Sequence, residues 1–323
     1  MKRRIIVNAV GLTRMFCALI ALMLMMGCEA PLDLQGVENV SKMPVKRFDR
    51  FQALAKSGET LIVVGFNGTV LVSNDGAERW KRLDLPGALD LIDIVACDDG
   101  SFAALDATRK IWISDDNGNS WDSKNIDTED SVTTLTCGPD NKLWVGGSYT
   151  SIYSTEDRGG TWQTSTLGED AMFTSIQFLD ENYGVASGEF GKVVVSRDGG
   201  ETWEIGPSMP NDFYPESTLF LDHDNGYAVG LNGKILKTTD AGASWTNEDS
   251  GTDAPLYGIT VHAGDLYVVG EGGMMLHRND GRWEQIQHGK PTRSYLRSAL
   301  SVNDHQMLIA GGAGALFLVP TQN

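Results

Sequence analysis

Tryptophan recurs along this chain at a nearly constant interval. Six of the eight Trp residues stand at positions 80, 121, 162, 203, 245 and 283, which gives successive spacings of 41, 41, 41, 42 and 38 residues. A repeat of that length indicates one small supersecondary unit copied along the chain, because such a unit buries its apolar face only by packing on its neighbours. The glycine content, 37 of 323 residues, also favours tight turns and argues against a helix bundle.

A version of the motif Ser/Thr-x-Asp-x-Gly-x-Ser/Thr-Trp precedes each of these Trp residues. Four copies are complete, the first has Ala in place of the Gly, and the last is one residue short. The motif resembles the Asp-box, or bacterial neuraminidase repeat, in which the Asp and hydroxyl side chains bond the backbone of a tight hairpin and the Trp fills the space between sheets. We therefore predict a structural and not a catalytic role for the box residues, which are Asp75, Trp80, Asp116, Trp121, Asp157, Trp162, Asp198, Trp203, Asp240 and Trp245.

Pairs of short β-branched runs, each pair joined by a Gly-rich turn, lie upstream of the boxes. Examples are residues 61–64 with 69–72 and residues 227–229 with 235–237, and the final pair is 307–310 with 315–319. Seven such pairs predict an all-β fold, a seven-bladed β-propeller of four-stranded antiparallel blades. Because no residues remain after the last pair for its fourth strand, the segment 34–42 is predicted to supply that strand and close the ring.

The amino-terminal segment predicts export and lipidation. Four basic residues precede an uninterrupted apolar run from Met15 to Met26, which is too short to cross a hydrocarbon core about 30 Å thick as a helix. The run ends in Met-Met-Gly-Cys28, which resembles the lipobox of bacterial lipoproteins, so Cys28 is predicted to be lipidated. The alternative is cleavage nearby with Cys28 incidental. Glu29 stands where Asp marks inner-membrane retention in enterobacterial lipoproteins, so we expect the outer membrane, facing the periplasm.

These assignments divide the chain into three parts. Residues 1–27 form the signal peptide, residues 28–43 the lipidated N-terminus with a short tether and the closing strand, and residues 44–323 the propeller. Loss of residues 1–27, which hold four basic and no acidic residues, changes the formal charge from −17 to −21, a field that opposes nucleic-acid binding. We expect a monomer, attached to the membrane through its lipid only, with no metal and no cofactor, since the five His show no ligand spacing.

Cys97 and Cys137 remain in the exported chain, at matching places in adjacent repeats. An oxidising compartment permits a disulfide between them. Neighbouring inner strands of a propeller are expected to hold the two Cα atoms beyond the roughly 7 Å that a disulfide tolerates. The sequence therefore favours two buried thiols and leaves the disulfide open.

Residues 44–323, with a Val-Gly-x-x-Gly turn and an Asp-box in most repeats behind an export signal, resemble the photosystem II stability and assembly factor family. The resemblance implies a non-enzymatic protein that binds a protein partner and assists assembly or operation of a membrane complex. It also implies an arginine-rich patch on one face. The corresponding basic residues here open the inner strands of blades one and seven, with aromatic residues near other inner-strand starts.

From this we predict a partner-binding site at the channel rim. Arg293, Tyr295 and Arg297 alternate and are expected to point the same way. The aromatic candidates are either exposed interface anchors or core residues between blades, and they are Phe173, Phe213, Tyr214 and Tyr257. The competing interpretation of the basic cluster is neutralisation by Asp49, Asp84 and Asp90 in surface ion pairs of small energy. The predicted site comprises Arg47, Arg50, Lys290, Arg293, Tyr295, Arg297, Tyr214 and Tyr257.

A glycan-binding or glycoside-hydrolysing propeller is the alternative function. Sialidases share the Asp-box, but their Arg-Ile-Pro element is absent and the arginines here gather at one seam. An inverting glycosidase needs only two facing carboxylates, which a chain with 43 acidic residues can supply. No nucleophile elbow or phosphate-binding loop is present.

Overall fold

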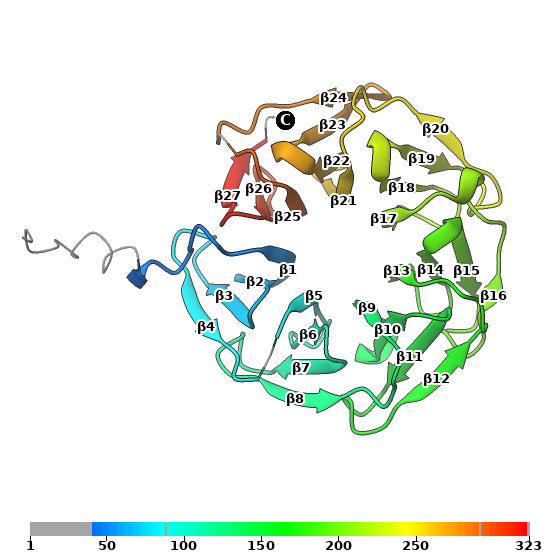
Figure 1. Cartoon of the computed structure of the whole chain (residues 1–323), viewed down its shortest axis with the longest axis horizontal. Coiled ribbons are helices and arrows are strands. Elements are labelled where there is room, and N and C mark those ends of the chain that lie inside the picture. The colour runs from blue at the N-terminus through cyan, green and yellow to red at the C-terminus, as the bar shows by residue number, and fades with distance from the viewer. Residues whose placement is uncertain (1–40, 88, 291, 322–323) are drawn as a thin grey trace, which may run out of the picture. The chain divides into compact units, whose positions relative to one another are not determined.

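The computed structural model describes residues 41–321 apart from positions 88 and 291. These residues form seven antiparallel sheets arranged as blades around a central channel (Figure 1). The predicted all-β seven-bladed propeller is confirmed. Strands within a blade are lettered A to D from the channel outwards, and consecutive strands pair in chain order.

Six described blades have four strands each, and five one-turn 3-10 helices lie in the connections. The elements of blades one to three are β1 (Phe51–Ser57), β2 (Thr60–Gly65), β3 (Thr69–Ser73), β4 (Lys81–Asp84), β5 (Leu91–Ala96), β6 (Phe102–Asp106), β7 (Lys110–Ser114), β8 (Asp122–Asn125), β9 (Val132–Cys137), η1 (Pro139–Asn141), β10 (Leu143–Gly147), β11 (Ser151–Thr155) and β12 (Gln163–Thr166).

Blades four to six continue the same order. Their elements are β13 (Phe173–Phe178), β14 (Gly184–Gly188), η2 (Glu189–Gly191), β15 (Lys192–Ser196), β16 (Glu204–Ile205), η3 (Pro210–Asp212), β17 (Pro215–Phe220), β18 (Gly226–Gly230), η4 (Leu231–Gly233), β19 (Ile235–Thr238), β20 (Thr246–Glu248), β21 (Leu256–His262), β22 (Asp265–Gly270), η5 (Glu271–Gly273), β23 (Met275–Asn279) and β24 (Arg282–Gln285).

Blade seven has three described strands, β25 (Leu296–Asn303), β26 (Gln306–Gly311) and β27 (Leu316–Pro320). The strand predicted over residues 34–42 to complete this blade falls mostly outside the described residues, and its last two, Ser41 and Lys42, are helical. Within the described residues the ring closes by packing, because Val302 and Leu308 of blade seven share a core cluster with Phe51 and Leu61 of blade one. Burial of apolar area at this seam stabilises the closure of the ring.

The core lies between blades as well as inside them. The B strands of blades one to five are buried along their whole length, for example Thr60–Gly65 and Phe102–Asp106. Each Asp-box Trp packs on one of the clusters that join neighbouring blades; Trp203, which is 6% exposed, meets Trp144 and Phe178 at ring-centroid distances of 6.1 and 6.0 Å. Aromatic packing of this kind contributes to a hydrophobic cluster at each junction between neighbouring blades.

Cys97 and Cys137 form a disulfide, with their Cα atoms 5.4 Å apart. The prediction of two buried thiols was wrong. Cys97 directly follows the inner strand β5 and Cys137 ends the inner strand β9, and inner strands of adjacent blades converge on the channel. The separation is therefore well inside the range that a disulfide requires, and the bond ties blade two to blade three.

Candidate functional site

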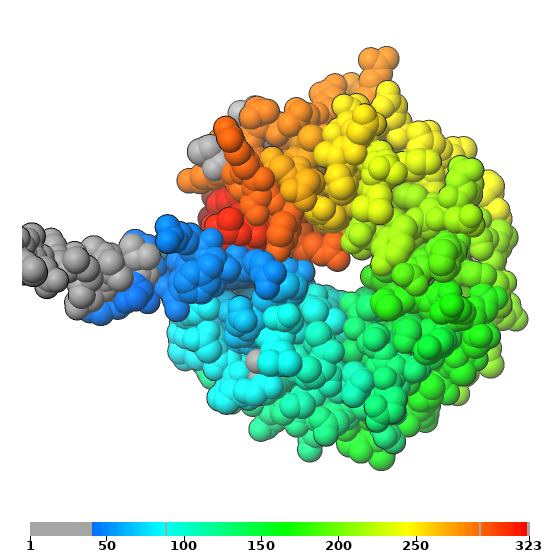
Figure 2. Space-filling view, viewed as in Figure 1, coloured from blue at the N-terminus to red at the C-terminus, as the bar shows by residue number. Residues whose placement is uncertain are grey.

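The inner strand of each described blade carries a β-bulge close to its start. In every case the pairing register with the B strand skips one residue. A bulge twists the strand and redirects the extra side chain, which is why bulges occur next to functional sites. The skipped residues all line the channel cavity of about 270 Å³, whose opening is visible as the hollow in Figure 2. They are Gln52, Ile92, Thr133, Thr174, Glu216, Tyr257 and Arg297.

Arg297 is held inside this cavity by an ion pair. Its Nη1 atom lies 2.9 Å from Oε2 of Glu216, so blade seven is joined to blade five across the channel. The guanidinium also stands 5.6 Å from the ring centroid of Tyr257, a cation–π distance. Arg297 was predicted to belong to the free basic cluster, and the structure places it in this network instead.

Tyr257 and Tyr295 extend the network along the channel wall. Their rings meet edge to face at 6.2 Å, and the Tyr295 hydroxyl accepts a hydrogen bond from Nε2 of Gln52 at 3.3 Å. The Tyr257 hydroxyl donates to Oε2 of Glu271 at 2.9 Å. Burial, followed by this bond to Glu271, raises the pKa of Tyr257 to about 12, so the phenol stays protonated at neutral pH.

Asp93 is the other carboxylate that lines the cavity. It accepts hydrogen bonds from the backbone N–H groups of Leu135 at 2.8 Å and Ile94 at 2.9 Å, and so joins blade two to blade three. Burial raises the pKa of Asp93 to about 6 against the opposing effect of these bonds. Since Asp93 is bonded to backbone and Glu216 to Arg297, both carboxylates that line the cavity already have partners.

Four of the predicted basic residues are exposed and lie in the segments that lead into the inner strands of blades one and seven. Arg47 and Arg50 belong to the segment before β1, and Lys290 and Arg293 to the segment before β25. The turn between β26 and β27 packs between the two segments, because Gly314 N–H donates to the Asp49 carbonyl at 2.9 Å and Gly312 N–H to the Tyr295 carbonyl at 3.0 Å. We call Arg47, Arg50, Lys290 and Arg293 the basic rim.

The acidic residues expected to neutralise the basic rim are bonded elsewhere. Asp49, almost fully buried, pairs with Nη1 of Arg82 at 3.0 Å, and Asp84 pairs with Nε of the same guanidinium at 3.0 Å. Asp90 accepts the backbone N–H of Asn67 at 3.1 Å. Across residues 44–321, as far as they are described, no rim residue makes an ion pair, although Arg50 stacks 4.2 Å from the centroid of Phe66.

The aromatic candidates divide into buried and half-buried groups. Phe173 and Phe213 are core residues, so they are not exposed anchors. Tyr214 and Tyr257 are half-buried. Burial followed by the nearby carboxylate of Glu216 raises the pKa of Tyr214. The structure thus brings Tyr257, Tyr295 and Arg297 together, with Tyr257 and Arg297 lining the channel cavity.

The Asp-box carboxylates are engaged in their own turns. In the box of blade two, Asp116 accepts the backbone N–H of Ser120 at 2.8 Å and its hydroxyl at 2.6 Å, while the Ser114 hydroxyl accepts the N–H of Gly118 at 2.9 Å. These bonds to the hydroxyl and N–H of Ser120 lower the pKa of Asp116 to about 2. The carboxylate therefore serves as a fixed anionic acceptor for a tight turn.

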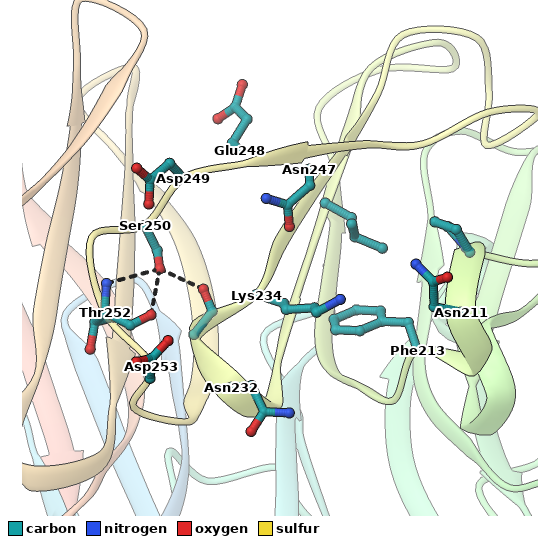
Figure 3. A pocket seen from close by; sticks show the side chains of 13 residues that line it. Asn211, Phe213, Asn232, Lys234, Asn247, Glu248, Asp249, Ser250, Thr252 and Asp253 are labelled. Atoms are coloured by element: carbon teal, nitrogen blue, oxygen red, sulfur yellow. Dashed lines mark hydrogen bonds between the residues drawn. The ribbon is translucent and has the colours of Figure 1, made fainter.

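A second cavity, of about 330 Å³, is lined by blade five and by the connections that enter and leave this blade (Figure 3). Its wall includes η3, η4 and the connection after β20. The Ser250 hydroxyl donates to the Gly233 carbonyl and closes one side, and Phe213 forms the opposite wall. Glu248 at its edge is bound by Arg278 at 2.9 Å. Asp249 and Asp253 also line this cavity, and Asp249 accepts the backbone N–H of Gly251 at 3.0 Å.

Sequence reasoning found the basic rim but missed the channel network. The hydrophobic pattern does not signal the seven β-bulges. Without a bulge, the side chains of a strand alternate strictly, which would place Arg293, Tyr295 and Arg297 on one side. Within the described residues no group of three or more His, Cys, Asp or Glu side chains is arranged to hold a metal ion. No described helix is long and apolar enough to cross a membrane. Cys28 and the signal peptide lie outside the described residues.

Residues 208–319 match the family model described as Photosynthesis system II assembly factor YCF48. This match, over blades five to seven, confirms the resemblance predicted from the repeats. A comparison with curated proteins finds no match.

Solved structures share the fold at low sequence identity. A structure described as YCF48 bound to D1 peptide superposes with a TM-score of 0.71 at 17% identity, covering 87% of this chain and 94% of that chain. YCF48 from Cyanidioschyzon merolae gives 0.68 at 15% identity, with 86% and 96% covered. Virginiamycin B lyase from Staphylococcus aureus gives 0.74 at 13% identity, with 88% and 97% covered. These likenesses establish a common fold, which an assembly factor and a lyase share.

Proposed function

We propose that this chain is a non-enzymatic, lipid-anchored propeller of the bacterial cell envelope that binds a protein partner at its basic rim and serves as an assembly or accessory factor for a membrane complex. One observation carries the proposal: four exposed cations gather at one seam of a chain whose mature charge is −21, and their neighbouring carboxylates are bonded elsewhere. Such an island attracts an acidic polypeptide segment.

The family match and one of the superposed structures support a polypeptide ligand. The matched family model is that of an assembly factor, and the first superposed propeller is described as bound to a peptide. The channel favours binding over glycoside hydrolysis, because its carboxylates Asp93 and Glu216 are held by backbone N–H groups and by Arg297. A hydrolase needs two carboxylates free to act as acid and base.

Lipidation of Cys28 would hold the propeller at a membrane surface. Cys28 lies 16 residues before Pro44, and a tether of that length reaches at most about 55 Å when fully extended. Residues 44–50, where the propeller begins, also contribute Arg47 and Arg50 to the basic rim. A lipid at Cys28 therefore keeps the rim within reach of membrane-embedded partners. Metabolic acyl labelling of the native chain and of Cys28→Ala, followed by separation of inner and outer membranes, tests the anchor and its address.

The partner is tested by crosslinking in intact envelopes followed by purification. The variant is Arg47→Glu/Arg293→Glu, and Arg297 is left intact because its removal would strand Glu216 in the channel. Lys124→Glu/Arg282→Glu is the matched control, since it makes the same charge change on the exposed outer strands β8 and β24.

We expect one crosslinked partner that the rim variant loses and the control keeps. A partner set that is the same in all three forms would refute the basic rim as the binding site. If the native chain crosslinks to no protein, glycan arrays and hydrolysis assays with Asp93→Asn and Glu216→Gln would test the alternative function.

A further inference from the structure

The turns between B and C strands repeat one backbone conformation around the ring. In six of the seven described blades the residue at the tip of this turn has a positive φ between 53° and 67°. This left-handed region suits Gly and Asn and is strained for bulky side chains. Four tips accordingly carry small or amide residues, namely Asn67, Asn232, Gly272 and Ala313.

Blades three and four break that rule. Their tips are Tyr149 and Phe190, both at φ 57°, and the side chains are 54% and 52% exposed. Neither ring is used to hold the fold together: among the described residues no hydrogen bond, ring stacking or cation contact involves either side chain. Two bulky aromatics thus occupy strained positions and face solvent, a combination typical of functional sites.

The two turns are linked by hydrogen bonds through the connection that lies between them. The Tyr149 turn contacts the next connection, because Thr150 N–H donates to the Ala171 carbonyl at 2.8 Å. That connection reaches the Phe190 turn, because Met172 N–H donates to Glu189 Oε2 at 2.9 Å. The neighbouring turn in blade five adds Leu231, which is also exposed. We call Tyr149, Phe190 and Leu231 the apolar arc.

Several carboxylates lie in the same group of turns and connections as the apolar arc. Asp170, Glu189, Asp212 and Asp253 lie in the connections and turns of blades three to five, and none of them pairs with a cation among the described residues. The nearby Lys192 is bound to Glu169. Blades three to five stand across the ring from the basic rim of blades seven and one (Figure 1). This face of the propeller therefore has a basic pole and an aromatic, acidic pole.

We infer that the apolar arc is a second binding site, which takes a polypeptide segment of alternating apolar and basic side chains. Apolar side chains of the segment pack on Tyr149, Phe190 and Leu231, and its Lys or Arg side chains reach the aromatic faces and the carboxylates. An anionic lipid surface is disfavoured by the same carboxylates. The inference rests on the proposed protein-binding role but does not require the basic rim.

The other blades supply the test variant. Tyr149→Asn/Phe190→Asn gives both turns the residue already present at the same position in Asn67 and Asn232. Because Asn adopts the left-handed conformation at lower cost, this variant should melt at the native temperature or above it. Ala313→Asn, which introduces the same residue at the tip of blade seven, is the matched control.

Binding is measured by fluorescence anisotropy with labelled ten-residue peptides and the mature chain. One peptide alternates Leu with Lys, a second alternates Leu with Glu, and a third alternates Ser with Lys. We expect the Leu–Lys peptide to bind the native chain and Ala313→Asn equally and the double Asn variant at least about tenfold more weakly. The other two peptides should bind the native chain at least about tenfold more weakly than the Leu–Lys peptide.

Several results would overturn the inference. The first is equal affinity of the native chain and the double Asn variant for the Leu–Lys peptide. The second is no binding of that peptide to the native chain at about millimolar concentration, and the third is tighter binding of the Leu–Glu peptide. The fourth is a lower melting temperature in the double variant, which would show that the two aromatic side chains have a structural role. If the native chain bound no peptide but bound phosphatidylglycerol vesicles, and only the double variant lost that binding, the arc would be a membrane-binding surface. If instead the native chain bound no peptide but self-associated in sedimentation, and only the double variant lost that association, the arc would bind a second copy of the chain. Arg47→Glu/Arg293→Glu should leave Leu–Lys binding intact, so failure at the basic rim and failure at the arc are distinguished.

Discussion

The disulfide between Cys97 and Cys137 allows a quantitative test of how this ring is stabilised. The two residues are 40 positions apart, so the bond closes a loop of blade two and the first strand of blade three. In the chain-entropy description, closing a loop of that length in the unfolded state is worth about 4 kcal/mol. Reduction should therefore lower the free energy of unfolding by about 4 kcal/mol, provided that the native contacts remain.

The assay is urea unfolding of the mature chain, followed by Trp fluorescence with and without a phosphine reductant. Cys28→Ala is introduced in every form to remove the third thiol. Cys97→Ala/Cys137→Ala should unfold like the reduced native chain and should not respond to the reductant. A difference between oxidised and reduced chains below about 1 kcal/mol would refute the reasoning, because it would mean that the unfolded ensemble is not restrained by the loop.

Three further perturbations test particular contacts. Folding raises the pKa of Asp93 from 3.8 to about 6, so the contribution of this group to stability is present below pH 4 and is lost as the pH rises through 6. Between pH 3.5 and 7.5 the free energy of unfolding of Asp93→Asn should therefore rise by about 3 kcal/mol relative to that of the native chain. Urea unfolding of both forms at both pH values measures this difference. Arg82→Met leaves the carboxylate of Asp49 buried without its cation and should cost about 3 kcal/mol, part of which Asp49→Asn restores; no recovery in the double variant would contradict the pairing. Gly200→Ala places a Cβ 2.1 Å from a Trp ring and should cost about 3 kcal/mol, whereas Gly242→Ala, whose nearest neighbour is 3.6 Å away, should cost about 1 kcal/mol; equal calorimetric melting temperatures would exclude the steric account.

The fold was predictable because its information is local and repeated. Each repeat carries its own hairpin strands, turn glycines and Asp-box, so one pattern read several times specifies the blade. Trp121 and Trp245 illustrate this, since the indole N–H of each donates to the carbonyl of its own box glycine at 3.1 Å. The seven blades and their strand order follow from such contacts, which lie within about 41 residues of chain.

The candidate site was predictable only in part. Arg47 and Arg293 could be placed at the same seam, because they take matching positions in repeats that a ring makes neighbours. Arg297 could not be assigned to the channel, because the bulge at the start of β25 redirects its side chain toward Glu216, 81 residues away. The apolar arc was not predicted from the sequence either. Tyr149 and Phe190 are unusual because they are bulky residues at turn positions with a positive φ, and that is known only from the structure.

The amino-acid sequence by itself determined the repeat, the strand order within a blade and the number of blades, because hydrophobic alternation and turn chemistry act over a few residues. The tertiary structure alone decided which residues face the channel, that Cys97 and Cys137 come within bonding distance, and that Arg82 takes the carboxylates near the basic rim. Those outcomes depend on how the inner strands converge and bulge when seven blades pack into a ring. The convergence and the bulges of the inner strands are properties of the closed ring, and no repeated sequence pattern signals them.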